Sequence, residues 1–322
     1  MSDKPLRIAS RRSPLAQAQA RMVRTLLAKA AGVAADDAEG RFPILTYVTS
    51  GDQNLTPDLA AIGGKGLFTK EVEAALLSGE ADIAVHSMKD MPAVMPKGLV
   101  LAATPAREDP RDSFVTVEGQ TLNEMPERAV IGTSSVRRAA QLKRLRPDVS
   151  IVPMRGNVQT RLRKLADGDA QGTFLAEAGL RRLDASDVRR MPLDPAVMLP
   201  ALGQGTLCVQ ARLDDTAALA SCRQINCLET ALASAAERAV TQRLEGSCRT
   251  PIAGLATVTD RTLMLKTELF SLDGEERFQA AATALMTGNE RQDLLRASQA
   301  GEDVAAQLIV QAGPLLQSLL SA

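Results

Sequence analysis

Short apolar segments alternate with longer amphipathic ones along most of this chain, and this alternation restricts its fold more than any other feature. Strands are expected at 6–9, 42–48, 81–85, 129–131, 149–152 and 173–176, and helices at 14–31, 67–77, 133–145 and 157–166. Ser13 and Pro14 form the N-cap and first-turn signature of the first helix. Because short links join strands to helices, the pattern predicts α/β layers with parallel sheets.

The order of segments changes in the last third of the chain. After residue 224 the pattern predicts a long helix to Leu244, a loop that holds Cys248, strands at 252–259, 262–270 and 277–284, and a C-terminal helix. This part is interpreted as a small α+β domain, whereas an apolar run at 206–211 is expected to return to the first domain as one more strand. A chain of 322 residues suits two or three such domains.

Composition and charge argue against several classes of function. The formal net charge of +0 disfavours a general polyanion binder, and an aromatic content of 2% disfavours a base-stacking platform. His86 is the only histidine and no Cys-x-x-Cys pair occurs, so no metal site is expected. The N-terminus has no signal-peptide pattern, and no run approaches the roughly 18 apolar residues of a membrane helix. We therefore expect a cytoplasmic protein whose four cysteines are thiols.

Arginines follow the ends of several predicted strands. They are Arg11, Arg12, Arg137, Arg138, Arg155, Arg161, Arg181 and Arg182. Ligands of open α/β sheets bind beyond the carboxyl ends of the strands. Cations in the first turn of a helix oppose its macrodipole, so a bound carboxylate or phosphate would explain their position. The alternative for each single arginine is a solvated surface charge.

Asp90 follows a buried strand and neighbours Lys89. A carboxylate among cations stays ionised, stabilises developing positive charge and can accept a proton from an acidic cation. A structural salt bridge or an N-cap is the alternative for Asp90. His86, four residues earlier, is a possible general base, although a histidine after an apolar strand is more often a structural hydrogen-bonding residue.

A glycine-rich segment at 63–67 superficially resembles a phosphate-binding loop. It lacks the Gly-x-x-x-x-Gly-Lys-Ser/Thr spacing and a strand directly before it, so a hinge or lid from which Lys65 reaches a ligand is the better interpretation.

Cys248 is the best candidate for a reactive thiol. It lies between Gly246-Ser247 and Arg249, and the cationic neighbour favours the thiolate. Cys208, in an apolar strand, is expected to be an inert core thiol.

These signals together resemble one known family, hydroxymethylbilane synthase, also called porphobilinogen deaminase. The matching motifs occur in family order from Leu6 to beyond Pro251. They are Arg7-Ile8-Ala9-Ser10-Arg11 with Ser13-Pro14-Leu15-Ala16, Gly63-Gly64-Lys65-Gly66-Leu67-Phe68, His86-Ser87-Met88-Lys89-Asp90, Arg107-Glu108-Asp109-Pro110-Arg111-Asp112, Gly132-Thr133-Ser134-Ser135-Val136-Arg137-Arg138, Arg155-Gly156-Asn157-Val158, Leu202-Gly203-Gln204-Gly205 and Glu245-Gly246-Ser247-Cys248. One such motif is weak, whereas eight in order are highly specific.

The resemblance implies an α/β fold with two lobes like those of periplasmic binding proteins and a small C-terminal α+β domain. The implied boundaries are 1–105 with 206–223 for lobe 1, 106–205 for lobe 2 and 224–322 for the C-terminal domain.

The resemblance also implies the roles of individual residues. Cys248 would carry a dipyrromethane cofactor as a thioether, and Asp90 would be the catalytic carboxylate. The other cofactor-binding residues would be Lys89, Ser13, Thr133, Ser135, Arg137, Arg138 and Arg155. The substrate-binding residues would be Arg11, Arg155, Arg161, Arg182, Lys65 and Phe68, the last two on a loop over the active site.

The implied reaction is a stepwise condensation of four porphobilinogen molecules with loss of ammonia, followed by release of hydroxymethylbilane by water. Each ring brings two carboxylates, which suits a cleft of many arginines. The implied context is tetrapyrrole and heme biosynthesis by a transferase that acts as a monomer and passes its product to uroporphyrinogen-III synthase. Neither nucleic acid nor a membrane is an expected partner.

Some positions depart from the family pattern. Gln171-Gly172 and Glu177 stand where small or apolar residues are usual, and Gln210 stands where an acidic residue is common. These departures make Arg182 the least secure assignment. The alternative function is a non-enzymatic two-lobed anion-binding protein, which explains the arginines but not Asp90 or Cys248. A cysteine-nucleophile hydrolase would need His86 as its histidine partner.

Overall fold

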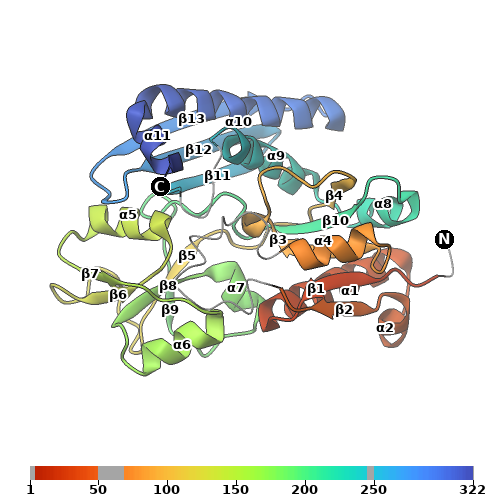
Figure 1. The fold of residues 1–322 in the computed structure, drawn as a ribbon, viewed down its shortest axis with the longest axis horizontal. Coiled ribbons are helices and arrows are strands. Elements are labelled where there is room, and N and C mark those ends of the chain that lie inside the picture. The colour runs from red at the N-terminus through yellow and green to blue at the C-terminus, as the bar shows by residue number, and fades with distance from the viewer. Residues whose placement is uncertain (1–3, 50–68, 245–249, 322) are drawn as a thin grey trace. The chain divides into compact units, whose positions relative to one another are not determined.

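The structure is a computed structural model that describes residues 4–49, 69–244 and 250–321 (Figure 1). The chain divides into two compact units, one of Met1–Glu108 with Thr206–Ala231 and the other of Asp109–Gly205 with Leu232–Ala322. No helix among the described residues has the length and apolar character needed to cross a bilayer. The predicted fold class is confirmed, with two five-stranded sheets and a smaller C-terminal sheet.

The first unit is built on a sheet of five strands in the order β2-β1-β3-β10-β4. The strands are β1 (Ile8–Arg11), β2 (Ile44–Tyr47), β3 (Ile83–Ser87), β4 (Leu99–Ala103) and β10 (Leu207–Arg212). β1 runs parallel to β2 and β3, whereas β10 is antiparallel to both β3 and β4. The segment 206–211 therefore forms a strand of the first unit's sheet, as expected. The strands expected from the alternation run parallel to one another, whereas β10 enters in the opposite direction and makes this sheet mixed.

Helices cover both faces of this sheet. On one face Ile83 and Val85 pack with α1 (Pro14–Ala31), together with β10 and α8 (Thr216–Arg223). On the other face Ala84 packs with α4 (Lys70–Leu77). The predicted Ser13 cap is confirmed, since its hydroxyl accepts a bond from the Ala16 N–H. The carboxyl ends of β1 and β3 meet at the same sheet edge, which places Arg11 near the short 3-10 turn η3 (Met88–Asp90).

The second unit contains another five-stranded sheet, in the order β7-β6-β8-β5-β9. Its strands are β5 (Asp112–Val115), β6 (Val130–Gly132), β7 (Ser150–Val152), β8 (Gly172–Ala176) and β9 (Arg190–Pro192). Its helices are α5 (Val136–Leu145), α6 (Val158–Ala166) and α7 (Glu177–Arg182). β6 is parallel to β7 and β8, and β5 is antiparallel to β8 and β9. The rings of Phe114 and Phe174, 5.3 Å apart at their centroids, fill the core.

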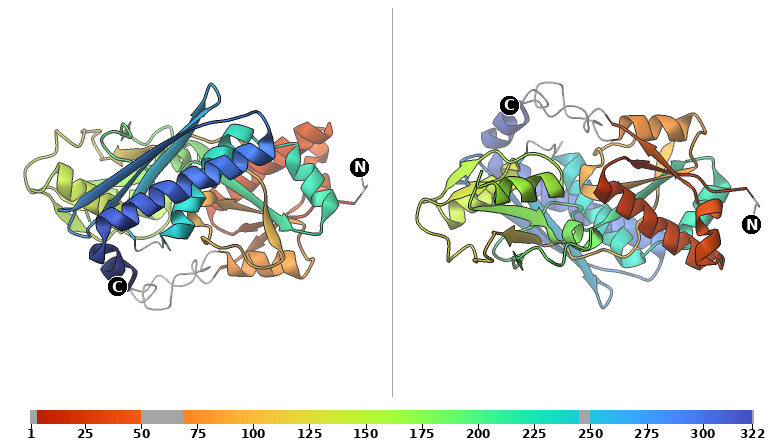
Figure 2. Two further views of the ribbon diagram at one scale, coloured as in Figure 1. Left: turned by 90° about the horizontal axis from the view of Figure 1, so that it is seen from above. Right: turned by 90° about the horizontal axis from the view of Figure 1, so that it is seen from below.

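The C-terminal part of the second unit is an antiparallel sheet beside helices (Figures 1 and 2). The strands are β11 (Ile252–Thr259), β12 (Thr262–Phe270) and β13 (Arg277–Leu285), which match the three predicted strands. The helices are α9 (Leu228–Arg243), α10 (Glu290–Ala312) and α11 (Pro314–Ser321). α9 and α10 approach so closely that a Cβ on Gly301 would lie 2.2 Å from the Ala236 carbonyl oxygen. The side chains between the sheet and the helices form one apolar core.

The turn between β12 and β13 docks on α5. Lys143 donates to the Leu272 carbonyl at 3.3 Å, and Arg144 donates to the Gly274 carbonyl at 3.1 Å. Gly274 has a φ of +76°, and a Cβ there would lie 2.4 Å from the carbonyl oxygen of Ala140. The absence of a side chain at 274 therefore permits both the turn and the approach to α5.

We predict that Gly274→Ala destabilises the protein more than Gly32→Ala. Gly32 also has a positive φ of +67°, but a Cβ there meets nothing within 4 Å, so this control isolates the backbone strain of about 1–2 kcal/mol. Gly274→Ala adds the collision with α5, worth a further ~1–3 kcal/mol. Chemical denaturation of both variants measures the difference. Equal losses of unfolding free energy would contradict the close docking of this turn.

Candidate active site

A small cavity lies at the sheet edge of the first unit, where β1 and β3 end. It is lined by Arg11, Ala16, Gln19, Thr69, Val85, His86, Ser87 and Asp90. The structure therefore brings two predicted site residues, Arg11 and Asp90, to one cavity. Arg11 is the last residue of β1, and Asp90 ends the turn that follows the parallel strand β3. Ligands bind at the carboxyl ends of strands in sheets of this kind.

The backbone around Asp90 is held in place while its side chain stays exposed. The Met88 N–H donates to the Thr206 carbonyl at 3.0 Å, and the Met91 N–H donates back to Met88 at 3.1 Å. The Met88 and Met91 side chains are buried on either side of Lys89 and Asp90. This anchoring presents the Asp90 carboxylate to the cavity without burying it. Lys89 is likewise exposed.

Gln19 is a cavity residue that sequence reasoning missed. It lies on α1, is 3% exposed, and donates through Nε2 to the Ser87 hydroxyl at 2.8 Å. A buried amide on an otherwise apolar helix face was the signal that could have identified it. The hydroxyl of Ser13, a predicted cofactor-binding residue, lies at the start of the same helix and is used there as the N-cap.

His86 is buried at the wall of the cavity and is 5% exposed. Burial lowers the pKa of its imidazole to about 4, although a hydrogen bond with Gln210 opposes the shift and the charge of Arg11 adds to it. The imidazole is therefore neutral at neutral pH. In the described part of the chain its Nε2 has no hydrogen-bond partner. Whether the imidazole is catalytic or structural therefore stays a prediction at this point.

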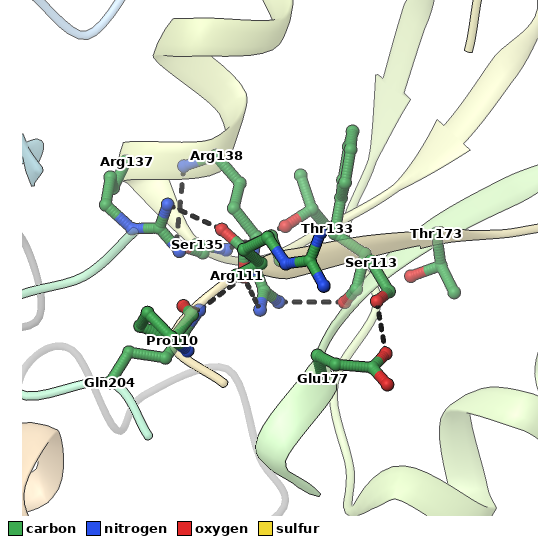
Figure 3. A network of polar contacts seen from close by, with 12 residues as sticks. Pro110, Arg111, Ser113, Thr133, Ser135, Arg137, Arg138, Thr173, Glu177 and Gln204 are labelled. Atoms are coloured by element: carbon green, nitrogen blue, oxygen red, sulfur yellow. Dashed lines mark hydrogen bonds and ion pairs between the residues drawn. The ribbon is translucent and has the colours of Figure 1, made fainter. Parts of the chain in front are cut away.

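In the second unit, two predicted arginines share one buried carboxylate (Figure 3). Arg137 donates from Nη1 to Asp112 Oδ2 at 2.7 Å, and Arg138 donates from Nη2 to Asp112 Oδ1 at 2.6 Å. Gln204 donates to the same Oδ1 at 2.9 Å. The arginines also donate from their Nη1 atoms to the carbonyls of Leu199 and Phe174. The two guanidinium groups are thus fixed on several sides.

The buried group of Asp112, Arg137 and Arg138 has more positive than negative charge. One carboxylate at 0% side-chain exposure faces two guanidinium groups at 6%, so the three groups carry a net charge of plus one. Burial by itself would raise the pKa of Asp112, but the charges and hydrogen bonds of the two arginines outweigh it and hold that pKa well below its usual range. A buried excess of positive charge favours a further anion nearby.

Thr133 and Ser135 lie at the start of α5, as predicted. The Ser135 N–H donates to the Thr133 hydroxyl at 3.2 Å, and the Arg138 N–H donates to the Ser135 hydroxyl at 3.4 Å. Ser135 is the N-cap of this helix, which explains why the helix begins here. Both hydroxyls are engaged with the backbone and retain capacity for a further hydrogen bond.

The remaining predicted arginines of the second unit occupy different environments. Arg155 is exposed just after β7. Arg161 lies on α6 and donates to the Gly156 carbonyl at 2.9 Å. Arg182 ends α7 and donates to the Gly205 carbonyl at 2.6 Å. Lys65, Phe68 and Cys248 lie outside the described residues.

Glu177, noted as a departure from the family pattern, belongs to a buried polar network on α7. It accepts a bond from Ser113 at 2.6 Å (Figure 3). It also accepts bonds from Arg181 and Arg190, both at 2.9 Å. Burial would raise the pKa of Glu177, but these donors lower it overall. The carboxylate therefore links α7 to β5 and β9, and the departure has a structural reason.

We predict that Asp112→Asn lowers the free energy of unfolding by about 3–5 kcal/mol, because two buried guanidinium groups lose their counterion. Asp148→Asn is the control, since Asp148 pairs with Arg146 in a far more exposed position and its loss should be smaller. Chemical denaturation gives both values, and equal losses would contradict the importance of the buried group.

The same carboxylate predicts a pH dependence. Its folded-state pKa lies below the unfolded value of about 3.9, so its stabilisation is complete above that pH and is lost as pH falls toward the folded pKa. Asp112→Asn should therefore flatten the acid limb of the stability curve. An unchanged acid limb would contradict this assignment.

Comparisons with known proteins place both parts of the chain in one family. Residues 6–220 match the model described as "Porphobilinogen deaminase, dipyromethane cofactor binding domain", and residues 231–309 match "Porphobilinogen deaminase, C-terminal domain". A porphobilinogen deaminase of Paracoccus denitrificans is 48% identical over 91% of this chain and 94% of the relative. One of Caulobacter vibrioides is 44% identical over 96% of both chains.

Solved structures give weaker likenesses. The VFT2 domain of BvgS from Bordetella pertussis is 16% identical, with a TM-score of 0.41 over 69% of this chain and 86% of that one. A TRAP periplasmic solute binding protein from Desulfovibrio salexigens is 14% identical, with a TM-score of 0.40 over 70% of this chain and 72% of that one. Likenesses this weak carry no argument about function. The family models and the relatives at 44–48% identity do, and the chain belongs to the porphobilinogen deaminase family.

Proposed function

We propose that this chain has the hydroxymethylbilane synthase activity of its family and that Asp90 performs the central chemistry in the cavity of the first unit. The observation that carries this assignment is the shared position of Asp90 and Arg11 at the cavity. A carboxylate there can accept the pyrrole N–H of porphobilinogen and stabilise the positive charge that develops when ammonia leaves. Arg11 can pair with a carboxylate of the same substrate.

The described residues fit a carboxylate-bearing dipyrromethane cofactor. The Asp112–Arg137–Arg138 group has an excess positive charge, and Arg137 engages its described partners through Nη1, so Nε and Nη2 remain for another acceptor. When bound, the cofactor supplies the free pyrrole carbon to which the first substrate is joined. The residues proposed to hold it are Cys248 through a thioether, with Lys89, Ser13, Thr133, Ser135, Arg137, Arg138 and Arg155.

Substrate carboxylates are assigned to a second set of cations. This set is Arg11, Arg155, Arg161 and Arg182, with Lys65 and Phe68 on the segment at 50–68. Arg161 and Arg182 each donate to a backbone carbonyl, which supports a fixed orientation for their guanidinium groups. A planar, oriented guanidinium suits bidentate pairing with acetate and propionate groups better than an ammonium does.

The alternative, a non-enzymatic two-lobed anion-binding protein, accounts for the arginines alone. It gives no role to the anchored turn that presents Asp90, and the chain's family consists of transferases.

The location, oligomeric state, next enzyme and domain bounds of the chain belong to the same proposal. We assign the chain to the cytoplasm as a monomer, with uroporphyrinogen-III synthase as the next enzyme. The lobes are proposed at 1–105 with 206–223 and at 106–205, and the C-terminal domain at 224–322.

The covalent cofactor predicts a mass difference. Intact protein purified from cells that make porphobilinogen should exceed its sequence mass by two linked pyrrole units, and Cys248→Ser should return to the sequence mass. Cys208→Ser is the matched control, because this thiol is buried in β10 and should leave the added mass in place. Wild-type protein at its bare sequence mass would overturn the cofactor assignment.

Asp90→Asn should retain the fold and the covalent cofactor mass of the wild-type protein. Its kcat should fall at least ~100-fold, because the variant lacks the charge that stabilises the substrate cation. Asp36→Asn, at an exposed carboxylate of the first unit, is the control and should retain activity. Steady-state turnover of porphobilinogen measures both variants. Wild-type turnover in Asp90→Asn would refute the role given to Asp90.

A further inference from the structure

His86 has a position that the role of Asp90 does not explain. It is the fourth residue of β3, is buried, and lines the same cavity as Asp90. It lies on the α4 face of the sheet, with Ala84. It is also the only histidine in the chain. An imidazole here can exchange a proton with a ligand in the cavity.

A buried chain of polar groups leads to His86 from α4. Thr69 donates to Glu73 Oε2 at 3.1 Å, and Gln210 Nε2 donates to Glu73 Oε1 at 3.1 Å. Gln210 lies on β10, whose Cys208 pairs with His86 in the sheet, so the amide is on the same face as the imidazole. All three polar residues are buried. Thr69, at the end of this run of hydrogen-bonded side chains farthest from His86, also lines the cavity.

The bond to Glu73 determines how the Gln210 amide is oriented. Since Nε2 is the donor to Glu73, Oε1 is left as an acceptor. Oε1 of Gln210 and Nε2 of His86 are both buried atoms without a hydrogen bond in the described residues. The two side chains lie on the same face of the neighbouring strands β10 and β3. In agreement with this position, Gln210 opposes the lowering of the His86 pKa by burial. A proton on Nε2 that is donated to Oε1 would satisfy both atoms.

Such a hydrogen bond would select one neutral tautomer. With its proton on Nε2, the imidazole keeps a lone pair on Nδ1. The charged groups around it are Arg11 from β1, Glu73 from α4 and Asp90 from η3. Burial and Arg11 lower the imidazole pKa, so the ring adds no positive charge to a cavity that must accommodate a cationic substrate.

We propose that His86, oriented by Gln210 and Glu73, is a further catalytic residue that accepts the ring proton released by each condensation. This inference rests on the proposed function. In each condensation the carbon–nitrogen bond of the substrate's ammonium form breaks and ammonia leaves. A carbon–carbon bond then forms to the free ring carbon of the acceptor. That carbon's hydrogen passes as a proton to Nδ1, its electron pair restores the aromatic ring, and the proton continues to ammonia to give ammonium.

Nuclear magnetic resonance of the ring nitrogens tests the tautomer without any activity measurement. In untagged holoenzyme labelled with 15N-histidine, the single imidazole should remain neutral, with its proton on Nε2, from about pH 8 to about pH 6. Gln210→Leu should remove this tautomer preference. A charged imidazole at neutral pH, or a proton held on Nδ1 in the wild type, would overturn the proposal.

Kinetic isotope effects test the proton transfer itself. With porphobilinogen deuterated at its free ring carbon, His86→Gln should lower kcat by about 100-fold with little change in KM and should show a primary isotope effect larger than that of the wild type. A purely structural role would lower activity without increasing the isotope effect. Wild-type kcat, or an unchanged isotope effect, would refute the role of His86.

Two further variants keep the test decisive. If His86→Gln does not fold, Gln210→Leu leaves the imidazole in place and should show the same increased isotope effect in a milder form. Val209→Ala is the matched control, because it trims a buried side chain of the same strand on the opposite face and should leave the isotope effect unchanged. If the wild-type protein did not turn over porphobilinogen, the proposed function itself would be overturned, whichever tautomer the His86 imidazole adopts.

Discussion

The buried carboxylate of Asp112 is the interaction on which the second unit depends. It lies at the first residue of β5 and neutralises one of two guanidinium groups in the first turn of α5. Cations at a helix N-terminus are unfavourable without an anion, and here the protein supplies part of that anion itself. The charge that remains uncompensated is what makes this place suitable for ligand carboxylates.

In the first unit the return of the chain as β10 has a comparable role. β10 enters between β3 and β4 and brings Gln210 to the face that carries His86. The Thr206 carbonyl, directly before β10, accepts a bond from the Met88 N–H. One strand thus fixes the turn that presents Asp90 and orients the groups behind the cavity. The departure at Gln210 has a physical consequence, since an amide can donate to Glu73 and accept from the imidazole at once.

Local sequence signals were sufficient for elements whose pattern is regular. The helix 14–31 was expected from its Ser-Pro start, and the three C-terminal strands from their strand-like runs at 252–259, 262–270 and 277–284. β4, β5 and β9 were missed. β5 begins with Asp112-Ser113, and β9 is Arg190-Met191-Pro192, so neither has an apolar run. Both are strands because neighbouring strands of the sheet pair with them.

The sequence by itself determined the family, the α/β class and the residue types of the site, because ordered motifs and periodicity are local properties of the chain. Tertiary structure alone decided which groups meet. Asp112 was visible only as part of a motif until folding placed it between Arg137 and Arg138, and Gln19 and Gln210 had no local signal of a shared site. Burial and charge pairing join residues far apart in sequence, and the environment they create sets the neutral state of His86.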